Sequence, residues 1–317
     1  MPRNSPVRTT PMSFIRPLNM LCLLSLAFST AGYAAPIADR QPEVSQDIVV
    51  TDARGKVIRL SKPAQTIIAL APHIVENVYS AGAGDKLIAA VNYSNYPAAA
   101  LKLPQVGGYN AINYEEVLAR KPDLVLGWIS GNGPQVAAQL ERLGMTVYVD
   151  ELRTLDDIAD EVMTIGKLAG TEAIANQRAH QWQQQLNQLR ERYSNAKTVS
   201  VFYQVWNSPL QTLNGQHLVS DVMKLCGGEN IFADALSIAP KINEESVISR
   251  NPDAIIASGM GEERPEWLDT WKQYPKLTAV QQQNLFFIPP DIIQRHTLRI
   301  LDGARLMCEY LQTAREK

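Results

Sequence analysis

The chain has 317 residues, of which 30 are lysine or arginine and 32 are aspartate or glutamate, so the formal net charge is −2. This balance excludes the broad basic surface that nucleic-acid binding requires, and no nucleic-acid partner is expected. Apart from a short apolar run near the N-terminus, no segment is long and apolar enough to span a bilayer.

Residues 1–35 have the pattern of a cleaved secretory signal peptide. Three arginines, Arg3, Arg8 and Arg16, precede an apolar run over residues 18–28, and small residues follow that run. A basic start, a short apolar centre and a small-residue cleavage site are the three parts of such a signal. The mature protein is therefore expected to be exported and to begin near residue 35.

The remaining chain, about 280 residues, is long for one core and suits two lobes. The first lobe is predicted at residues 36–168, where short apolar runs alternate with segments of helical pattern. Such alternation implies a parallel sheet that is covered by helices on both faces. Strands are predicted at residues 47–51, 56–60, 67–70, 87–91, 124–128 and 146–149, and helices at residues 74–81, 114–120 and 133–143.

A long helix is predicted between the lobes, within residues 169–196. From Thr171 to Tyr193 apolar side chains recur in steps of three and four, which marks one face of a helix. At about 1.5 Å per residue this helix would reach roughly 35 Å, the span of a whole domain. Its polar remainder contains no glycine or proline, so we expect a rigid connector.

The second lobe is predicted at residues 197–317, where the alternation resumes. Strands are predicted at residues 198–203, 254–257 and 285–288, and helices at residues 217–225 and 298–313. Cys226 and Cys308 are the two cysteines that remain after signal cleavage, and neither lies in a CxxC motif. In an oxidising compartment such a pair is expected to form one disulfide, which would join the terminal helix to the helix that ends near Gly227.

One segment occurs twice. Residues 113–126 align without gaps with residues 243–256, with the same Asn, Glu, Val, Arg, Pro and Asp at matching positions. Each copy starts with a residue suited to cap a helix and ends that helix before a Pro-Asp pair and an apolar strand. This predicts an α/β fold of two similar lobes with mostly parallel sheets, joined by one long rigid helix, with a ligand cleft between them.

Large aromatic side chains stand at or just after the strand ends of the first lobe. Trp128 ends the strand at residues 124–128, and Tyr93, Tyr96 and Tyr109 lie in loops. Since ligands of open α/β folds bind beyond the strand ends, these four side chains are expected to face the cleft.

Six short motifs give the chain a family resemblance. They lie at residues 69–72, 93–97, 107–110, 121–128, 226–232 and 291–295. With these motifs in this order, the chain resembles the periplasmic substrate-binding proteins of the helical-backbone class, which serve ABC importers for siderophores, haem and cobalamin. Within that class it is most similar to the vitamin B12 (cobalamin) binders, from Val50 to about Leu311.

The resemblance implies that a monomer in the periplasm captures cobalamin or a related corrinoid, without catalysis and with no cofactor or metal ion of its own. A corrin ring is a broad, mostly apolar disc with an amide rim, which suits stiff aromatic side chains. An arginine beside an aspartate suits the phosphate of its nucleotide tail. The ligand-binding residues that the resemblance implies are Tyr93, Tyr109 and Trp128 in the first lobe and Trp206, Asp291 and Arg295 in the second.

The resemblance also implies a membrane partner, an ABC transporter permease dimer with its ATPase. Glu115 and Glu245 occupy equivalent positions, each in the first turn of a predicted helix, one per lobe. The helix dipole explains a carboxylate there without any partner. The resemblance adds that the two glutamates meet arginines of the two permease subunits.

His73 is a further candidate ligand residue. It follows Pro72 in a loop that is expected to face the cleft, where a neutral imidazole would suit the upper face of cobalt. The alternative is an exposed histidine that begins a helix.

Four other functions would each need residues of a different kind. A haem binder would need an axial ligand, for which Tyr93, Tyr96, His73 and His296 are candidates, and an anionic siderophore would need a basic cluster that is not evident. A binder of divalent metal ions is disfavoured because the chain has only 4 histidines. An enzyme is disfavoured because the sequence has no GxSxG motif, no P-loop and no GxGxxG between a strand and a helix.

Overall fold

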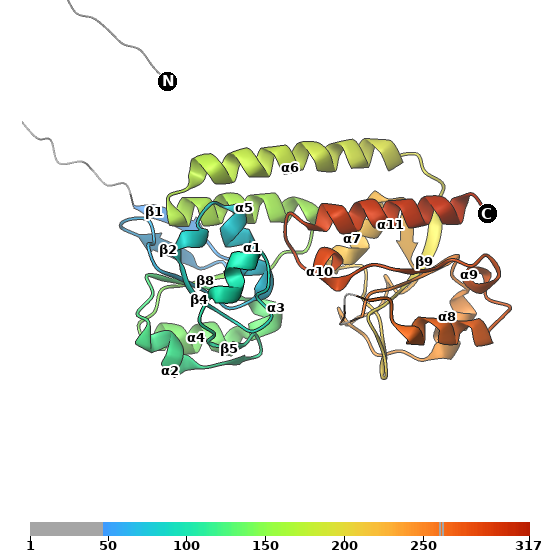
Figure 1. Cartoon of the computed structure of the whole chain (residues 1–317), viewed down its shortest axis with the longest axis horizontal. Coiled ribbons are helices and arrows are strands. Elements are labelled where there is room, and N and C mark those ends of the chain that lie inside the picture. The colour runs from blue at the N-terminus through green and yellow to red at the C-terminus, as the bar shows by residue number, and fades with distance from the viewer. Residues whose placement is uncertain (1–46, 260, 262) are drawn as a thin grey trace, which may run out of the picture. The chain divides into compact units, whose positions relative to one another are not determined.

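The computed structural model describes residues 47–259, 261 and 263–317 (Figure 1), and residues 45–317 form one compact unit. The predicted signal peptide lies outside the described residues. Within the described part of the chain, no helix is both long and apolar enough to cross a membrane.

The first lobe contains a parallel sheet of four strands in the order β4-β3-β7-β8, preceded by the antiparallel hairpin β1-β2. Neighbouring residues of each strand face opposite sides: Ile67 and Leu124 pack into one hydrophobic cluster, and Ile68 and Val125 into another. The central strands β3 and β7 are apolar because both faces of the sheet are covered. They are β1 (Ile48–Thr51), β2 (Val57–Leu60), β3 (Ile67–Ala69), β4 (Leu87–Ala90), β7 (Leu124–Trp128) and β8 (Val147–Asp150), with a short hairpin of β5 (Gly107–Gly108) and β6 (Ala111–Ile112).

Helices and short 3₁₀ turns cover this sheet. They are α1 (Pro72–Ser80), η1 (Gly84–Lys86), η2 (Ala98–Lys102), α2 (Tyr114–Ala119), α3 (Ile129–Asn132) and α4 (Pro134–Arg142). The helix predicted to begin at residue 74 begins at Pro72, since proline at the first helical position loses no hydrogen bond.

The second lobe contains a parallel sheet in the order β12-β9-β13-β14. Its edge strand β12 was not predicted. Its strands are β9 (Val199–Gln204), β12 (Gly228–Asn230), β13 (Ala254–Ala257) and β14 (Leu285–Phe287), with a hairpin of β10 (Trp206–Asn207) and β11 (Leu210–Gln211). Its helices are α7 (Leu218–Leu225), α8 (Glu244–Arg250), η3 (Glu266–Gln273), α9 (Thr278–Gln281), α10 (Pro290–Ile293) and α11 (Ile300–Arg315).

The two sheets have the same order, so the predicted duplication is confirmed in three dimensions. In each lobe the third strand follows the repeated helix, α2 before β7 and α8 before β13. The repeated aspartates have the same role: Asp123 accepts hydrogen bonds from the Thr66 and Gln65 backbone, and Asp253 accepts from the backbone and hydroxyl of Ser200. These bonds hold the pKa of Asp123 below its ordinary value, chiefly through the Gln65 N–H.

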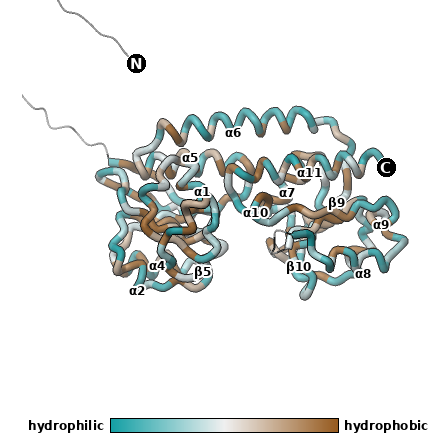
Figure 2. Tube along the Cα trace, viewed as in Figure 1, coloured by the Kyte–Doolittle hydropathy of each residue, from teal (hydrophilic) through white to brown (hydrophobic). Residues whose placement is uncertain are grey.

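The connection between the lobes consists of two helices, α5 (Leu155–Ala169) and α6 (Glu172–Tyr193), where one long helix was expected. Leu155 and Ile158 of α5 pack in the hydrophobic core of the second lobe, whereas Val162 and Ile165 pack in that of the first. The predicted first-lobe range, residues 36–168, therefore contains a helix that both cores share. Figure 1 shows α6 running alongside α5, and Figure 2 shows that α6 is mostly hydrophilic along its length.

The predicted disulfide is confirmed. Cys226 at the C-terminal end of α7 is bonded to Cys308 of α11, with their Cα atoms 4.7 Å apart and a separation of 82 positions in sequence. Both side chains are fully buried in the second-lobe core. The bond thus joins the terminal helix to the helix that precedes β12.

Candidate functional site

A cavity of about 420 Å³ lies between the two lobes. Trp128, Ser130 and Glu151 line it from the first lobe, and Gln216, His217 and His296 are among the residues that line it from the second. Its walls combine large rings with polar side chains, which is typical of a site for a small organic ligand.

Trp128 is half-buried at the carboxyl end of β7, where it lines the cavity and packs against the first-lobe core. The side chain of Asn132 holds this strand end. Its Oδ1 accepts from the Trp128 N–H at 2.7 Å, and its Nδ2 donates to the carbonyls of Leu70 and Tyr109 at 2.9 and 2.6 Å. A Cβ atom on Gly131 would lie 1.9 Å from the indole ring, so only glycine leaves room for this ring position. Asn132 and Gly131 were not predicted as site residues.

Three other rings lie around the ring of Trp128. Its centroid lies 5.1 Å from that of His73, 6.2 Å from that of Tyr109 and 6.2 Å from that of His296. Tyr109 and Trp128, two of the predicted ligand residues, are therefore brought together by the fold. Tyr109 remains 40% exposed, so part of this ring cluster is open to a ligand.

His73 does not lie in the loop where it was predicted. It was expected in a loop that faces the cleft, with an exposed histidine at the start of a helix as the alternative. The Pro72 start places it in the first turn of α1, as in the alternative, but it is only 5% exposed. Its Nε2 lies 3.0 Å from Asp150 Oδ2, so this nitrogen already has a partner inside the protein. The ring of His73 packs edge-on against the ring of Trp128. His73 is not among the residues that line the cavity.

His217 and His296 line the cavity from the second lobe, and their rings lie 5.6 Å apart. Burial, together with the nearby charge of Arg153, lowers the pKa of His217 to about 4. Burial, with His73 and His217 as neighbours, holds the pKa of His296 well below its ordinary value. Both imidazoles are therefore neutral at neutral pH. The sequence pointed to His296 only as a haem-ligand candidate, and His217 was missed because it was treated as the start of a helix.

Asp291 and Arg295 form an ion pair at 2.7 Å within the second lobe. The guanidinium of Arg295 also bonds to Glu76 of α1 at 2.7 Å and donates to the carbonyl of Tyr93 at 3.3 Å. Arg299 lies 3.2 Å from the same Glu76 carboxylate, which is almost fully buried. Three predicted ligand residues, Tyr93, Asp291 and Arg295, thus come together in an interlobe ion cluster.

Tyr93 and Trp206 are two further predicted ligand residues, one in each lobe. Tyr93 is 78% exposed and has a φ of +66°, a left-handed conformation that is uncommon for a large side chain. Trp206 is half-exposed on the β10-β11 hairpin, and its Nε1 donates to the carbonyl of Ser208. Neither side chain is among those that line the 420 Å³ cavity.

A buried carboxyl lies where α5 passes between the two cores. Glu161 accepts a hydrogen bond from the hydroxyl of Tyr148 at 2.7 Å. Burial, and then the charge of Asp150, raises the pKa of Glu161 to about 8. The same burial raises the pKa of Tyr148, so the hydroxyl remains a donor.

Glu115 and Glu245 are exposed in the first turns of α2 and α8. Asn113 and Asn243 cap these helices as predicted, by accepting from backbone N–H groups of the first turn. Within the described part of the chain, neither glutamate side chain has a hydrogen-bond or ion-pair partner. Figure 1 shows α2 and α8 on the same side of their lobes, opposite to α6.

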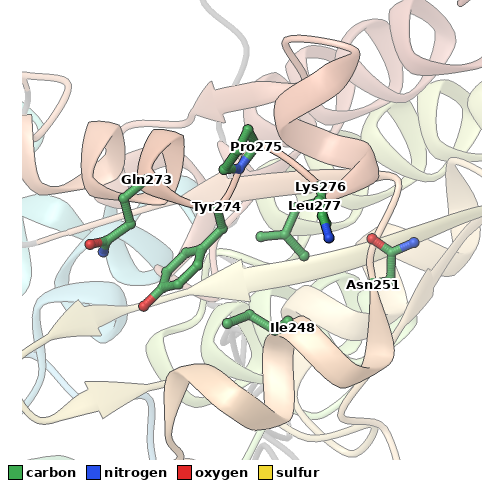
Figure 3. Close-up of a pocket in the computed structure, with 7 residues that line it drawn as sticks. All are labelled: Ile248, Asn251, Gln273, Tyr274, Pro275, Lys276 and Leu277. Carbon is green, nitrogen blue, oxygen red and sulfur yellow. The ribbon is translucent and has the colours of Figure 1, made fainter.

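A second cavity of about 340 Å³ lies in the second lobe, between α8 and residues 273–277 (Figure 3). Ile248 and Leu277 give it apolar walls, and the hydroxyl of Tyr274 donates to Glu244 at one side. Residues of a single lobe line this cavity, and none of them was predicted to bind ligand. The interlobe cavity is therefore the candidate ligand site.

The described part of the chain shows no site for a free metal ion. No group of three or more His, Cys, Asp or Glu side chains is placed there to hold one. The single imidazoles of the interlobe cavity would need further ligands from another molecule to complete a coordination sphere.

Comparisons with known proteins agree with this architecture. Residues 67–292 match the sequence profile described as "Periplasmic binding protein". The vitamin B12-binding protein of Vibrio cholerae serotype O1 is 37% identical over 255 residues, 80% of this chain and 92% of that protein. The vitamin B12-binding protein of Yersinia pestis is 35% identical over 251 residues, 79% of this chain and 88% of that protein.

Solved structures show the same arrangement. The crystal structure of the periplasmic vitamin B12 binding protein BtuF of Vibrio cholerae matches with a TM-score of 0.75 at 37% identity, over 80% of this chain and 99% of that one. The periplasmic haem-binding protein RhuT from Roseiflexus sp. RS-1 matches with a TM-score of 0.70 at 19% identity, over 79% and 99%. At that lower identity the likeness concerns the fold alone.

Proposed function

Because the chain belongs to the periplasmic binding protein family, we propose that it captures cobalamin or a related corrinoid between its lobes and delivers it to an ABC importer. The protein acts as a carrier and performs no chemistry on its ligand. Its relatives at 35–37% identity are named as vitamin B12-binding proteins.

The observation that carries this proposal is the interlobe cavity with Trp128 in its wall. Its volume of about 420 Å³ is in the range of small-molecule sites. The indole, with Tyr109 beside it, offers a broad apolar surface to a flat ring. Ser130, Glu151 and Gln216 offer hydrogen-bonding groups to an amide rim.

The interlobe ion cluster supplies the remaining contacts in this proposal. Arg295 and Asp291 contact the nucleotide tail of the corrinoid. Tyr93, whose carbonyl accepts from Arg295, and Trp206, on the hairpin of the second lobe, also contact the ligand. Glu76 already orients the guanidinium of Arg295, so Arg295 loses little conformational entropy when it binds a phosphate. His73 is proposed to contribute indirectly, as a support for Trp128.

Delivery requires a partner in the membrane, which we propose to be a permease dimer with its ATPase. Glu115 and Glu245 are exposed, unpaired within the described residues and on the same side of the two lobes. One carboxylate per lobe suits a transporter with two equivalent subunits, each presenting an arginine. The protein in this proposal is a monomer, and the signal at residues 1–35 directs its export.

Haem is a second candidate ligand because two histidines line the cavity. A neutral imidazole is a common axial ligand of haem iron. Haem lacks the amide rim of a corrinoid, so the two ligands place different demands on the polar wall.

Calorimetric titration with cyanocobalamin, cobinamide and haemin, side by side, tests the proposed function. We expect one-to-one binding of cyanocobalamin, with haemin much weaker. Heat from haemin alone would favour the second candidate. The absence of heat with all three compounds would contradict both candidates.

A further inference from the structure

The two histidines that line the interlobe cavity differ in what their ring nitrogens do. The Nδ1 of His217 accepts a hydrogen bond from the Val219 N–H at 3.1 Å. In a neutral imidazole the other nitrogen, Nε2, must then carry the proton. His217 is therefore a hydrogen-bond donor through Nε2, and a metal atom would have to displace that proton.

His296 has no such restraint on its ring. It is 7% exposed, and neither ring nitrogen forms a hydrogen bond with another described residue. Its backbone is held, because its carbonyl accepts from the side chain of Asn77 at 3.0 Å. The rings of His73, His217 and Trp128 surround it at 5.6, 5.6 and 6.2 Å between centroids. A buried polar ring without partners is unusual in a folded protein and points to a partner that arrives from outside.

The chemistry of that partner follows from the number of donors. A free metal ion needs several protein ligands, and no cluster of three acidic, histidine or cysteine side chains is present among the described residues. One imidazole is enough only for a metal whose other positions are filled by its own macrocycle. An imidazole with an unused lone pair beside Trp128 is therefore suited to the metal of a bound tetrapyrrole-like ring.

We propose that His296 is an axial ligand of the cobalt atom in the corrinoid that the cleft binds. This inference rests on the proposed function, and it replaces His73, whose Nε2 is bonded to Asp150, with a histidine that lines the cavity. Binding exchanges ligands: the bond from cobalt to a water molecule breaks, the water leaves, and a ring nitrogen of His296 donates its lone pair to cobalt. No electron is transferred and the charge of the complex is unchanged.

The surroundings of His296 favour this exchange. Burial and the two neighbouring histidines keep the ring neutral, so its lone pair is not lost to a proton at neutral pH. The neighbouring Trp128 places the plane of a stacked ring near the imidazole. Asn77 fixes the backbone at His296, so little freedom is lost when the metal is bound.

Comparison of aquocobalamin with cyanocobalamin tests the proposal on the unaltered protein. The water on aquocobalamin is exchangeable, whereas the cyanide on cyanocobalamin blocks the upper face. We expect the visible spectrum of bound aquocobalamin to become that of an imidazole complex, and its Kd to be lower than that of cyanocobalamin by about tenfold or more. The spectrum of cyanocobalamin should not change on binding.

Variants then identify the histidine. His296→Ala, with His296→Gln as a variant of closer volume, should leave the aquocobalamin spectrum unshifted and make the two Kd values equal. His217→Ala removes a cavity-lining ring, so it should weaken binding of both compounds alike and still give the shifted spectrum at saturation. His180→Ala, on the exposed face of α6, should retain both the affinity and the spectral shift.

An unshifted aquocobalamin spectrum in the wild-type protein, or an undiminished shift in both His296 variants, would overturn the inference. Binding of cyanocobalamin distinguishes an error in this inference from an error in the proposed function. If cyanocobalamin binds and the aquocobalamin spectrum does not move, only the ligation by His296 is wrong. If neither compound binds, the corrinoid function itself is wrong.

Discussion

In the first lobe β7 ends in Trp128, whereas at the matching place in the second lobe β13 is followed by Ser258, a small buried residue. The scaffold around these two positions is the same. Val117 and Val247 are fully buried at equivalent places in α2 and α8. The residues that build the lobes have thus been kept, and those at the strand ends have diverged.

This difference shows how one scaffold provides two unlike walls. The first lobe contributes Trp128 to the cavity wall, with the ring of Tyr109 beside it, and the second lobe contributes the imidazoles of His217 and His296. A ligand that has a flat apolar ring and a coordinating or hydrogen-bonding centre needs both walls. Duplication alone would have supplied the same wall twice.

The largest expected effect concerns the exposed glutamate that each lobe has in the first turn of its repeated helix. Replacing both glutamates of the proposed docking surface, Glu115→Ala with Glu245→Ala, should abolish stimulation of the transporter ATPase and corrinoid uptake. Affinity for the corrinoid should stay within about twofold, since charges on a docking surface act on association with the partner. Reconstituted vesicles with the cognate transporter measure both quantities.

A matched control variant removes two negative charges from α6, on the opposite side of the lobes. Glu172 and Glu191 are exposed near the two ends of α6. The double variant Glu172→Ala with Glu191→Ala should transport normally. Normal uptake by the Glu115 and Glu245 variant would leave those two carboxylates as helix-end charges only.

The disulfide is a feature that only the second lobe has among the described residues. Cys226→Ala with Cys308→Ala should lower the free energy of unfolding by about 2–4 kcal/mol, because the bond restricts the unfolded chain. Urea unfolding measures this loss, and a reducing agent should have no further effect on the double variant. Hydrogen exchange should quicken more in β9 and β13 than in β3 and β7. Equal acceleration in both lobes would show that the bond stabilises the whole unit.

Two tryptophans, one per lobe, separate binding from stability. Trp128 lines the cavity, whereas Trp271 is 2% exposed and donates from Nε1 to Gln204 at 2.7 Å. Trp128→Ala should weaken corrinoid binding by more than about 1 kcal/mol. Trp271→Ala should cost about 3–5 kcal/mol of stability, as for a core aromatic.

Titration and thermal melting of both variants check this contrast. Trp128 is half-buried against the first-lobe core, so its loss should lower Tm by less than the loss of Trp271 does. Gly131→Ala gives an independent probe, because its Cβ would displace the indole without removing it. Unchanged affinity in both Trp128→Ala and Gly131→Ala would remove Trp128 from the site.

The smallest expected effect concerns Glu161, on the helix that both cores share. Its pKa is raised from 4.5 to about 8 in the folded protein, so folding favours the protonated form. This contribution to stability is complete below about pH 4.5 and is lost as pH rises through about 8. Glu161→Gln keeps an acceptor for Tyr148 and removes the titration. At pH 9 we expect its Tm to exceed that of the wild-type protein, and at pH 5 we expect little difference.

Melting curves of both proteins between pH 5 and pH 9 test this expectation. Parallel curves would mean that Glu161 does not titrate in this range.

Much of the fold was predictable because its signals are local. Apolar runs marked both sheets, and the repeated asparagines and Pro-Asp pairs marked matching units in the two lobes. The edge strand β12, Gly228–Asn230, has no apolar run and depends on pairing with β9, so its sequence does not reveal it. The position of α5 was also missed, because only the packed structure shows which core each of its turns joins.

The site was predictable in part for the same reason. Trp128 was recognised from its place at a strand end. The ion cluster was not, because Glu76 and Arg295 are 219 positions apart in sequence. His217 caps a helix through its ring, a role that only the folded geometry distinguishes from that of an ordinary first residue.

Hydrogen exchange of the protein with and without cyanocobalamin tests the central claim, that both lobes enclose one corrinoid, most directly. Protection is expected in residues 128–132 of the first lobe together with residues 213–218 and 294–297 of the second. Residues 273–277, beside the other cavity (Figure 3), should exchange at the same rate in both samples. Protection confined to one lobe, or found only at residues 273–277, would contradict the claim.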